Sequence, residues 1–276
     1  MSWFETFRDR VVVVTGASSG IGRETALAFG AAGARVALMA RRRHELEALA
    51  AEMRTDVAVV PTDVTDRRAV RAAFDTVAGH FGRLDVVVNN AGILRPSPVL
   101  DIEPADLDAM LRVNLFGALF VMQEAVRRML AQDDGVVVNV ASLGGRRGVS
   151  PIGAYCATKF ALVGLTEALR EELRGSNVHV ALVEPGVVET PMVHDVTQDQ
   201  EFLEFWPQSL NMPPSWVVWA IFAAARFRLA ELSVPPGAGT VEKLASLAPA
   251  ASDALVHWVK AASRWFAPAR HDPTSQ

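Results

Sequence analysis

The segment AYCATK, residues 154–159, carries two side chains that could do acid–base or nucleophilic chemistry. Tyr155 and Cys156 are neighbours, and each is the only residue of its type among 276. Lys159 follows Tyr155 by four positions, so on a helix the two share a face. A free tyrosine has a pKa of about 10, and a nearby cation favours the phenolate. Alone, a pair at this spacing is most often an ordinary helix-surface contact. Together with the motifs described below, it predicts a general acid–base that works nearer to neutral pH.

Cys156 would point away from this pair. One step along a helix turns a side chain by about 100°, so Cys156 leaves the face that Tyr155 and Lys159 share. A lone cysteine is most often a small buried hydrophobe, which we predict here, with a reactive thiol as the alternative. One cysteine makes no disulfide within the chain, which favours a reducing, cytoplasmic setting.

A glycine-rich turn, TGASSGIG, lies between an expected strand at Val11–Val14 and an expected helix at Arg23–Ala32. Its glycines, Gly16, Gly20 and Gly22, would let backbone N–H groups approach a pyrophosphate, which the start of the helix also attracts. A plain βα turn is the alternative. The strand before it and the helix after it favour a dinucleotide site.

Three arginines follow the second expected strand. A chain that binds NAD usually has Asp or Glu about 20 residues after the glycine turn, but Ala40 stands there, followed by Arg41, Arg42 and Arg43. Cations at the start of a helix oppose its dipole, and a 2′-phosphate would offset that cost. We therefore predict NADP(H), bound by Arg41 and Arg42, over NAD(H). The alternative is a solvated cluster.

Further motifs follow in a fixed order along the chain. They are TDVTD with Asp63 and Val64, NNAG with Asn90, Ala91 and Gly92, VNLFG with Asn114, NVAS with Ser142, the tyrosine–lysine pair, and EPGVVET with Pro185, Gly186, Val188 and Thr190. With the glycine turn, this ordered set resembles the short-chain dehydrogenase/reductase family from Val11 to Thr190, about two-thirds of the chain. Each motif alone is weak evidence for this family, whereas the ordered set is specific to it.

The resemblance implies an oxidoreductase that moves a hydride between a nicotinamide cofactor and a carbonyl or alcohol. It implies a catalytic tetrad of Asn114, Ser142, Tyr155 and Lys159. It also implies a cofactor site made of Gly16, Ser18, Ser19, Gly20, Ile21, Gly22, Arg41, Arg42, Asp63, Val64, Asn90, Ala91, Gly92, Tyr155, Lys159, Pro185, Gly186, Val188 and Thr190, with no metal. Family members are commonly homodimers or homotetramers.

Apolar, β-branched runs alternate with helix-like segments and indicate the fold. Strands are expected at Val11–Val14, Val36–Met39, Val57–Val60, Val86–Val88, Val136–Val140, Val178–Val183 and Glu231–Val234. Continuous apolar runs are typical of parallel strands buried on both faces. We predict one α/β, Rossmann-like, doubly wound domain over residues 1–234 with a seven-stranded parallel sheet. The last strand and the total of seven strands rest partly on the family resemblance. A helical C-terminal extension would cover 235–276.

The expected substrate loop, about 191–215, is rich in bulky apolar residues. With the start of the next helix it includes Met192, Phe202, Phe205, Trp206, Met212, Trp216 and Trp219. This composition predicts an apolar carbonyl or alcohol substrate, although Trp216 and Trp219 fit a core helix better. Arg146 and Arg147 lie near the expected mouth. We interpret them as structural or solvated, with an anionic substrate group as the alternative.

The C-terminal extension has an apolar stripe formed by Leu255, Trp258, Val259, Ala262, Trp265 and Phe266. Packing on the domain or on a partner subunit is the favoured interpretation, followed by a substrate lid and then a membrane-surface helix. No apolar run reaches the about 18 residues of a membrane span, and the first residues do not resemble a secretory signal. A net charge of −4 without a long basic tract argues against nucleic acid. The non-enzymatic alternative is an NADP(H)-binding sensor or scaffold.

Overall fold

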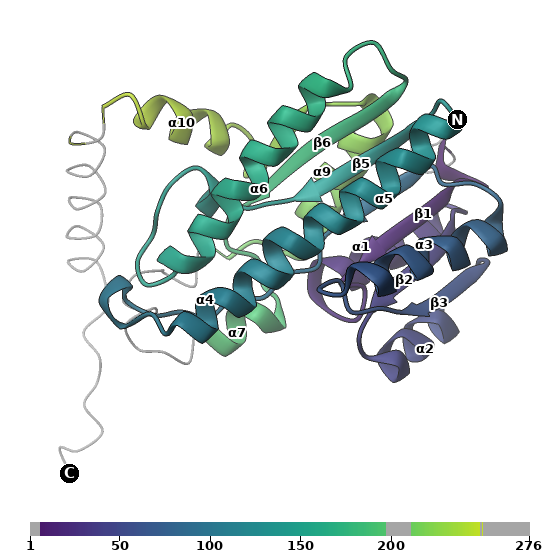
Figure 1. The fold of residues 1–276 in the computed structure, drawn as a ribbon, viewed down its shortest axis with the longest axis horizontal. Helices are drawn as coiled ribbons and strands as arrows, with labels where there is room; N and C mark the ends of the chain where they lie inside the picture. Colours follow the sequence, from purple (N-terminus) through teal and green to yellow (C-terminus); the bar gives the residue numbers. More distant parts are fainter. Residues whose placement is uncertain (1–5, 197–210, 249, 251–276) are drawn as a thin grey trace.

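A seven-stranded parallel sheet, covered by helices on both faces, forms the body of the protein (Figure 1). A computed structural model of the chain describes residues 6–196, 211–248 and 250. The strand order is β3-β2-β1-β4-β5-β6-β7, which reverses direction between β1 and β4. In such sheets, ligands bind beyond the carboxyl ends of the strands where the order reverses.

All seven expected strands are present. They are β1 Val11–Thr15, β2 Arg35–Ala40, β3 Val57–Pro61, β4 Val86–Asn89, β5 Gly135–Val140, β6 Val178–Pro185 and β7 Glu231–Val234. Every residue of β1, β4 and β5 is buried, as the continuous apolar runs predicted. The edge strand β3 instead alternates, because Ala58 and Val60 are buried on the face with α3, whereas Val57 and Val59 on the opposite face are only partly buried.

The longer helices divide between the two faces of the sheet. Their bounds are α1 Gly20–Ala31, α2 Arg43–Glu52, α3 Arg67–Phe81, α4 Pro104–Leu111, α5 Ala118–Ala131, α6 Gly153–Glu172 and α9 Pro214–Phe227, with the shorter α7 Pro191–Val196 and α10 Ala238–Ala245. One hydrophobic cluster joins the sheet to α1, α2 and α9, and the other joins it to α3, α5 and α6. The result is a three-layer doubly wound fold, as predicted.

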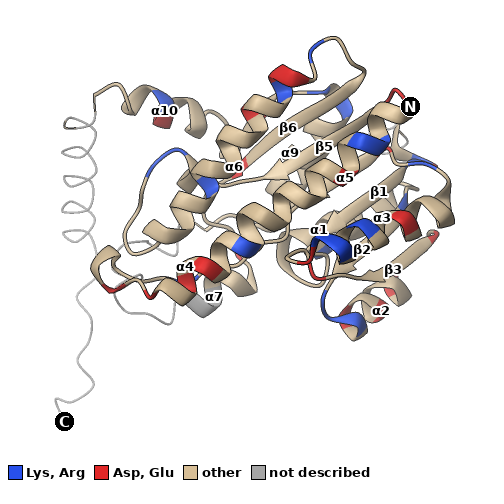
Figure 2. Cartoon of the chain, viewed as in Figure 1, with Lys and Arg blue, Asp and Glu red and all other residues tan. Residues whose placement is uncertain are grey.

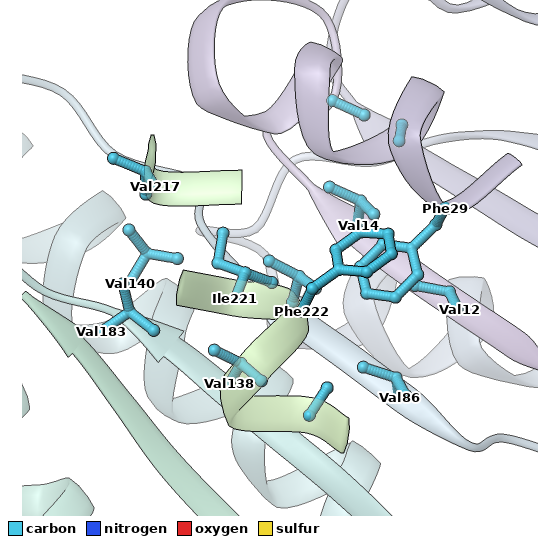
Figure 3. Close-up of a cluster of buried hydrophobic side chains, with 14 of the residues drawn as sticks. Val12, Val14, Phe29, Val86, Val138, Val140, Val183, Val217, Ile221 and Phe222 are labelled. Carbon is cyan, nitrogen blue, oxygen red and sulfur yellow. The ribbon is translucent and has the colours of Figure 1, made fainter. Parts of the chain in front are cut away.

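Aromatic stacking locks α9 onto α1 (Figure 3). The rings of Phe29 and Phe222 stack with centroids 4.1 Å apart, and Phe7 packs edge-on against both. Ile221 and Val217 of α9 lie over the central strands in the same cluster. The late helix α9 is therefore part of the main core.

The helical run Pro104–Ala131 is long and apolar enough to cross a membrane by length and composition alone, but half of its most apolar window is buried inside the protein. Its middle, Arg112–Gly117, is a π-helical turn between α4 and α5. Buried residues of α5 pack on the sheet, so the run is a core helix of the domain.

The C-terminal region is helical where the structure describes it. After β7, α10 occupies Ala238–Ala245, in agreement with the predicted extension. The apolar stripe predicted at 255–266 lies outside the described residues, as does most of the expected substrate loop. The division of the chain at residue 234 stays a prediction.

Candidate active site

The carboxyl ends of β1 and β4 are tied together by one threonine. The Thr15 hydroxyl accepts hydrogen bonds from the backbone N–H groups of Asn90, at 2.9 Å, and Ala91, at 3.0 Å. The Asn90 amide in turn donates to the Thr15 carbonyl at 3.1 Å. The NNAG segment is thereby fixed beside the glycine turn, at the point where the strand order reverses.

The glycine turn is packed too closely to hold side chains. A Cβ on Gly22 would lie 2.3 Å from the carbonyl oxygen of Gly16, which is a backbone clash. Gly16 itself has φ +67°, in the left-handed region that favours glycine. The turn therefore presents bare backbone at the start of α1, as a pyrophosphate site requires.

A cavity of about 380 Å³ extends from this turn along the ends of β2 and β3. Its lining includes most of the predicted cofactor residues: Gly16, Ser18, Ser19, Gly20, Ile21, Arg41, Arg42, Asp63, Val64, Asn90, Ala91, Gly92 and Thr190. Gly22 packs against the Gly16 backbone within the turn and is not among the lining residues. We call this space the nucleotide cavity.

Arg41 and Arg42 stand exposed at one end of the nucleotide cavity, at the basic start of α2 (Figure 2). Arg42 donates to the Ser18 hydroxyl at 3.0 Å, so it reaches across to the glycine turn. Within the described part of the chain, Arg41 makes no ion pair. Two cations beside the glycine turn, neither of them bound to a carboxylate of the described residues, suit an anionic ligand group.

The predicted tyrosine–lysine pair lies on the first turns of α6. The Lys159 ammonium is 5.6 Å from the centre of the Tyr155 ring, which agrees with a shared helix face. It donates to the Val140 carbonyl at the end of β5, at 3.0 Å. Burial lowers the pKa of Lys159 to about 8, because the charged form loses its hydration.

Tyr155 differs from the expectation in the direction of its pKa shift. The Lys159 cation was expected to lower the pKa of the phenol, but burial raises it, and a hydrogen bond with the Ser142 hydroxyl opposes the rise only in part. Ser142 also accepts from the Gly144 N–H at 3.0 Å, which fixes its hydroxyl at the start of the 3₁₀ turn Leu143–Gly145, labelled η4. In the chain itself, Tyr155 is a neutral phenol near neutral pH.

Asn114 is presented by the π-helical turn. Its buried amide accepts from the Ile93 N–H at 2.8 Å and donates to the Ile93 carbonyl at 2.9 Å. It also donates to the Thr158 hydroxyl on α6, at 3.1 Å. A Cβ on Gly92 would lie 3.4 Å from the Asn114 oxygen and 3.8 Å from the Lys159 nitrogen, so these two groups flank one small space.

A second cavity, of about 240 Å³, opens beside the tetrad. We call it the substrate cavity. Ser142, Tyr155 and Lys159 line it together with Leu94, Leu143, Val149, Ile152, Val187, Met192 and Val193. Ile21, Asn90, Gly92, Thr190 and Met192 line both cavities, so the two adjoin. Pro185, Gly186 and Val188, predicted to hold the cofactor, line this cavity and not the nucleotide cavity.

The structure describes only some of the bulky apolar residues of the expected substrate loop and the helix start that follows it. Met192 lines both cavities, and Met212 is buried beside Gly186. Phe202, Phe205 and Trp206 lie outside the described residues. Trp216 and Trp219 were expected to pack in the core, but each is 52% exposed on α9. They are not among the residues that line the substrate cavity.

The two arginines near the expected mouth have different surroundings. Arg146 is structural, as we interpreted it: it donates to Glu184 on β6 at 2.5 Å, to Glu167 on α6 at 3.0 Å and to Glu231 on β7 at 3.0 Å. Burial raises the pKa of Glu184, Arg146 opposes the rise, and the nearby Glu231 adds to it. Arg147 instead lines the substrate cavity.

Cys156 is a buried side chain, as predicted. It packs against Gly144, whose Cβ would lie 3.2 Å from the sulfur, and burial raises the pKa of the thiol. Sequence reasoning missed Thr15, Thr158 and Glu242. Thr158, three positions after Tyr155, could have been found from helical spacing. Nothing in the sequence signals that Glu242, beyond the last strand, lines the substrate cavity.

Comparisons with known proteins show which family the sequence matches. A sequence model of a family described as short chain dehydrogenase matches residues 10–201, a range that contains all four tetrad residues. An uncharacterised oxidoreductase of Staphylococcus epidermidis is 33% identical over 229 residues, 83% of this chain and 98% of that protein. D-Threitol dehydrogenase of Mycolicibacterium smegmatis is 39% identical over 188 residues, 67% of this chain and 72% of that protein.

Two solved structures share the overall fold. Levodione reductase superposes with a TM-score of 0.78 at 29% identity, covering 85% of this chain and 99% of that one. A short-chain dehydrogenase/reductase from Burkholderia phymatum, solved in complex with NAD, also superposes with a TM-score of 0.78, at 26% identity over 86% of this chain and 93% of its own.

Proposed function

Because this chain belongs to the short-chain dehydrogenase/reductase family, we propose that it is an NADP(H)-dependent oxidoreductase acting on a carbonyl or secondary alcohol of an apolar substrate. One observation carries the proposal. The hydroxyl groups of Tyr155 and Ser142 meet at the wall of an apolar cavity that adjoins a nucleotide cavity. A carbonyl oxygen placed there could accept from both hydroxyls.

When bound, the cofactor supplies the hydride, and the residues of this chain supply the proton. The raised pKa of Tyr155 keeps its phenol protonated near neutral pH, which suits donation to an oxygen that gains negative charge. Ser142 can polarise the same oxygen through its hydroxyl hydrogen bond. This pair therefore favours carbonyl reduction, with alcohol oxidation as the reverse reaction.

Lys159 and Asn114 would return a proton to the phenol. With a pKa of about 8, Lys159 can lose and regain a proton near neutral pH. The Asn114 oxygen and the Lys159 nitrogen flank the small space over Gly92, where a water could connect them. We assign these two residues to proton supply and Tyr155 to direct transfer.

The proposed cofactor preference rests on Arg41 and Arg42. The proposed substrate class rests on the side chains that line the substrate cavity. Arg41 and Arg42 would pair with a 2′-phosphate, since guanidinium matches phosphate oxygens geometrically. The substrate cavity is lined mainly by aliphatic side chains, which favours an apolar body next to the reacting carbonyl. The predicted cytoplasmic setting and the predicted homodimer or homotetramer stay predictions.

The test of the reaction is a screen of ketones and aldehydes with NADPH and NADH side by side. Tyr155→Phe should lower turnover of any active carbonyl at least about 100-fold, as loss of a general acid does, and should still bind NADPH. Undiminished turnover would remove Tyr155 from the mechanism. A screen without any turnover, together with a partner protein that binds in only one redox state, would favour the sensor or scaffold alternative.

A separate pair of variants tests the cofactor preference. Arg41→Ala should weaken NADPH binding about tenfold, because a charge-assisted contact to phosphate contributes roughly 1.5–3 kcal/mol, and should leave NADH binding unchanged. Arg43→Ala is the control, because Arg43 is not among the residues lining the nucleotide cavity. Equal losses for both cofactors in Arg41→Ala would refute the assignment.

A further inference from the structure

The helix after the last strand contributes a charged side chain to the substrate cavity. Glu242 of α10 lines that cavity, and so does Arg147, just beyond the η4 turn that carries Ser142. Their side chains are 29% and 23% exposed, with Arg147 Nη1 3.9 Å from Glu242 Oε2. Glu242 lies beyond residues 10–201, where the family model matches. It is therefore a feature of this chain rather than of the matched family core.

A cluster of ion pairs beneath the cavity fixes α10 in place. The Lys243 ammonium donates to both carboxylate oxygens of Glu231 at 2.6 Å, and Arg146 donates to the same carboxylate at 3.0 Å. A Cβ on Gly239 would lie 2.8 Å from the buried Glu184 carboxylate, so α10 approaches as closely as a glycine permits. These contacts anchor the helix that carries Glu242.

Adjacent residues on the two segments have complementary roles. Arg146 pairs with Glu184 on β6, and Lys243 pairs with Glu231 on β7. The residues next to them in sequence, Arg147 and Glu242, line the substrate cavity. Figure 2 shows acidic and basic positions on α10 and basic positions on the segment before α6. The supporting cluster therefore sets where the two cavity charges stand.

We propose that Glu242 and Arg147 are specificity-determining residues that select uncharged substrates, an inference that rests on the proposed reductase function. Glu242 offsets the positive charge of Arg147 in a cavity whose other walls are mainly apolar. Because the two charges largely cancel, a substrate carboxylate or ammonium would lose its hydration in this apolar cavity without a net opposite charge to compensate, so each is disfavoured. The substrate is an apolar, neutral ketone or alcohol.

The test compares three series of methyl ketones with six to ten carbons: neutral ketones, keto acids with a terminal carboxylate, and ketones with a terminal amine. The readout is kcat/KM with NADPH for each charged probe, divided by that for the neutral ketone of equal length. Glu242→Gln should raise the keto-acid ratio about tenfold, because it removes one negative charge near the substrate. Arg147→Gln should instead raise the amine ratio and lower the keto-acid ratio.

Glu172→Gln is the matched control, because it removes the same charge from an exposed position on α6 that does not line the cavity. Its ratios should equal those of the wild type. If Glu242→Gln and Arg147→Gln also leave both ratios unchanged, or change them in the same direction, the specificity proposal is wrong while the reductase function stands. If the wild type reduces no ketone in the three series or in the wider screen, the reductase function itself fails.

Discussion

Replacing Arg146 by methionine removes the cation that balances a fully buried carboxylate. Glu184 is 0% exposed, and Arg146, itself 11% exposed, donates to it at 2.5 Å. Of the other two carboxylates on Arg146, Glu231 keeps Lys243 as a partner and Glu167 is half exposed. The substitution therefore leaves one carboxylate, that of Glu184, buried without its cation and beside the charged Glu231.

The expected cost follows from this geometry. Removing one partner of a buried ion pair costs about 3–5 kcal/mol, so Arg146→Met should lower the free energy of unfolding by about that amount at pH 8. The loss should shrink on acidification. A carboxyl with a raised folded-state pKa contributes stability at low pH that is lost as the pH rises through that pKa. Without Arg146 the pKa of Glu184 rises further, so at pH 5.5 protonation should remove more than about half of the loss.

Urea unfolding of the wild type and the variant at pH 8 and pH 5.5, without cofactor, measures both effects. Arg112→Met is the control, because among the described residues Arg112 pairs only with Asp108, in an exposed i,i+4 contact, and its loss should change stability by about 0.5 kcal/mol or less. The double variant Arg146→Met/Glu184→Gln should recover most of the loss, because it buries no charge at position 184. A loss below about 1 kcal/mol at pH 8, or one that is the same at both pH values, would refute the reasoning.

Three further predictions concern the catalytic and cofactor residues. Lys159→Met should raise the free energy of unfolding by roughly 2–3 kcal/mol at pH 7, because the folded-state pKa of about 8 means that the buried ammonium destabilises the fold. The gain in stability should fade as the pH rises from 8 towards 10. Urea unfolding across this pH range measures it, and a gain that does not fade would contradict this reasoning. Gly22→Ala should weaken NADPH binding at least about tenfold in a titration, since its Cβ would clash with the Gly16 carbonyl, whereas Gly79→Ala on α3, with open space around it, should bind normally. Asn114→Ala should lower both stability, by about 1–3 kcal/mol, and kcat, because the Ile93 backbone loses both hydrogen bonds to the amide; an unchanged kcat would exclude Asn114 from proton supply.

The elements of this fold were predictable because their signals are local. Apolar runs bounded by turn residues marked the seven strands, and glycine spacing marked the nucleotide turn. The i,i+4 spacing placed Lys159 on the tyrosine's face. These features depend on neighbours in the sequence, which a single chain displays directly.

The electrostatics of the site could not be predicted in the same way, because they depend on burial and on distant segments. The sign of the shift in the pKa of Tyr155 is set by desolvation, which outweighs the hydrogen bond with the Ser142 hydroxyl. The partners of Arg146 come from α6, β6 and β7, and the charge facing Arg147 comes from α10. Only the folded sheet brings these groups together.

The π-helical turn at Arg112–Gly117 has a consequence for insertions and deletions in this helix. Deleting one residue from a regular core helix rotates everything after it by about 100° and misplaces the buried face. A π turn already contains an extra residue, so losing one there would restore regular α-helical phase and keep α4 and α5 in register with the core. Such a shortened chain would remain folded while the Asn114 amide left Ile93. The cost of that deletion would fall mainly on the reaction, and on the fold only through the two hydrogen bonds that the Ile93 backbone loses.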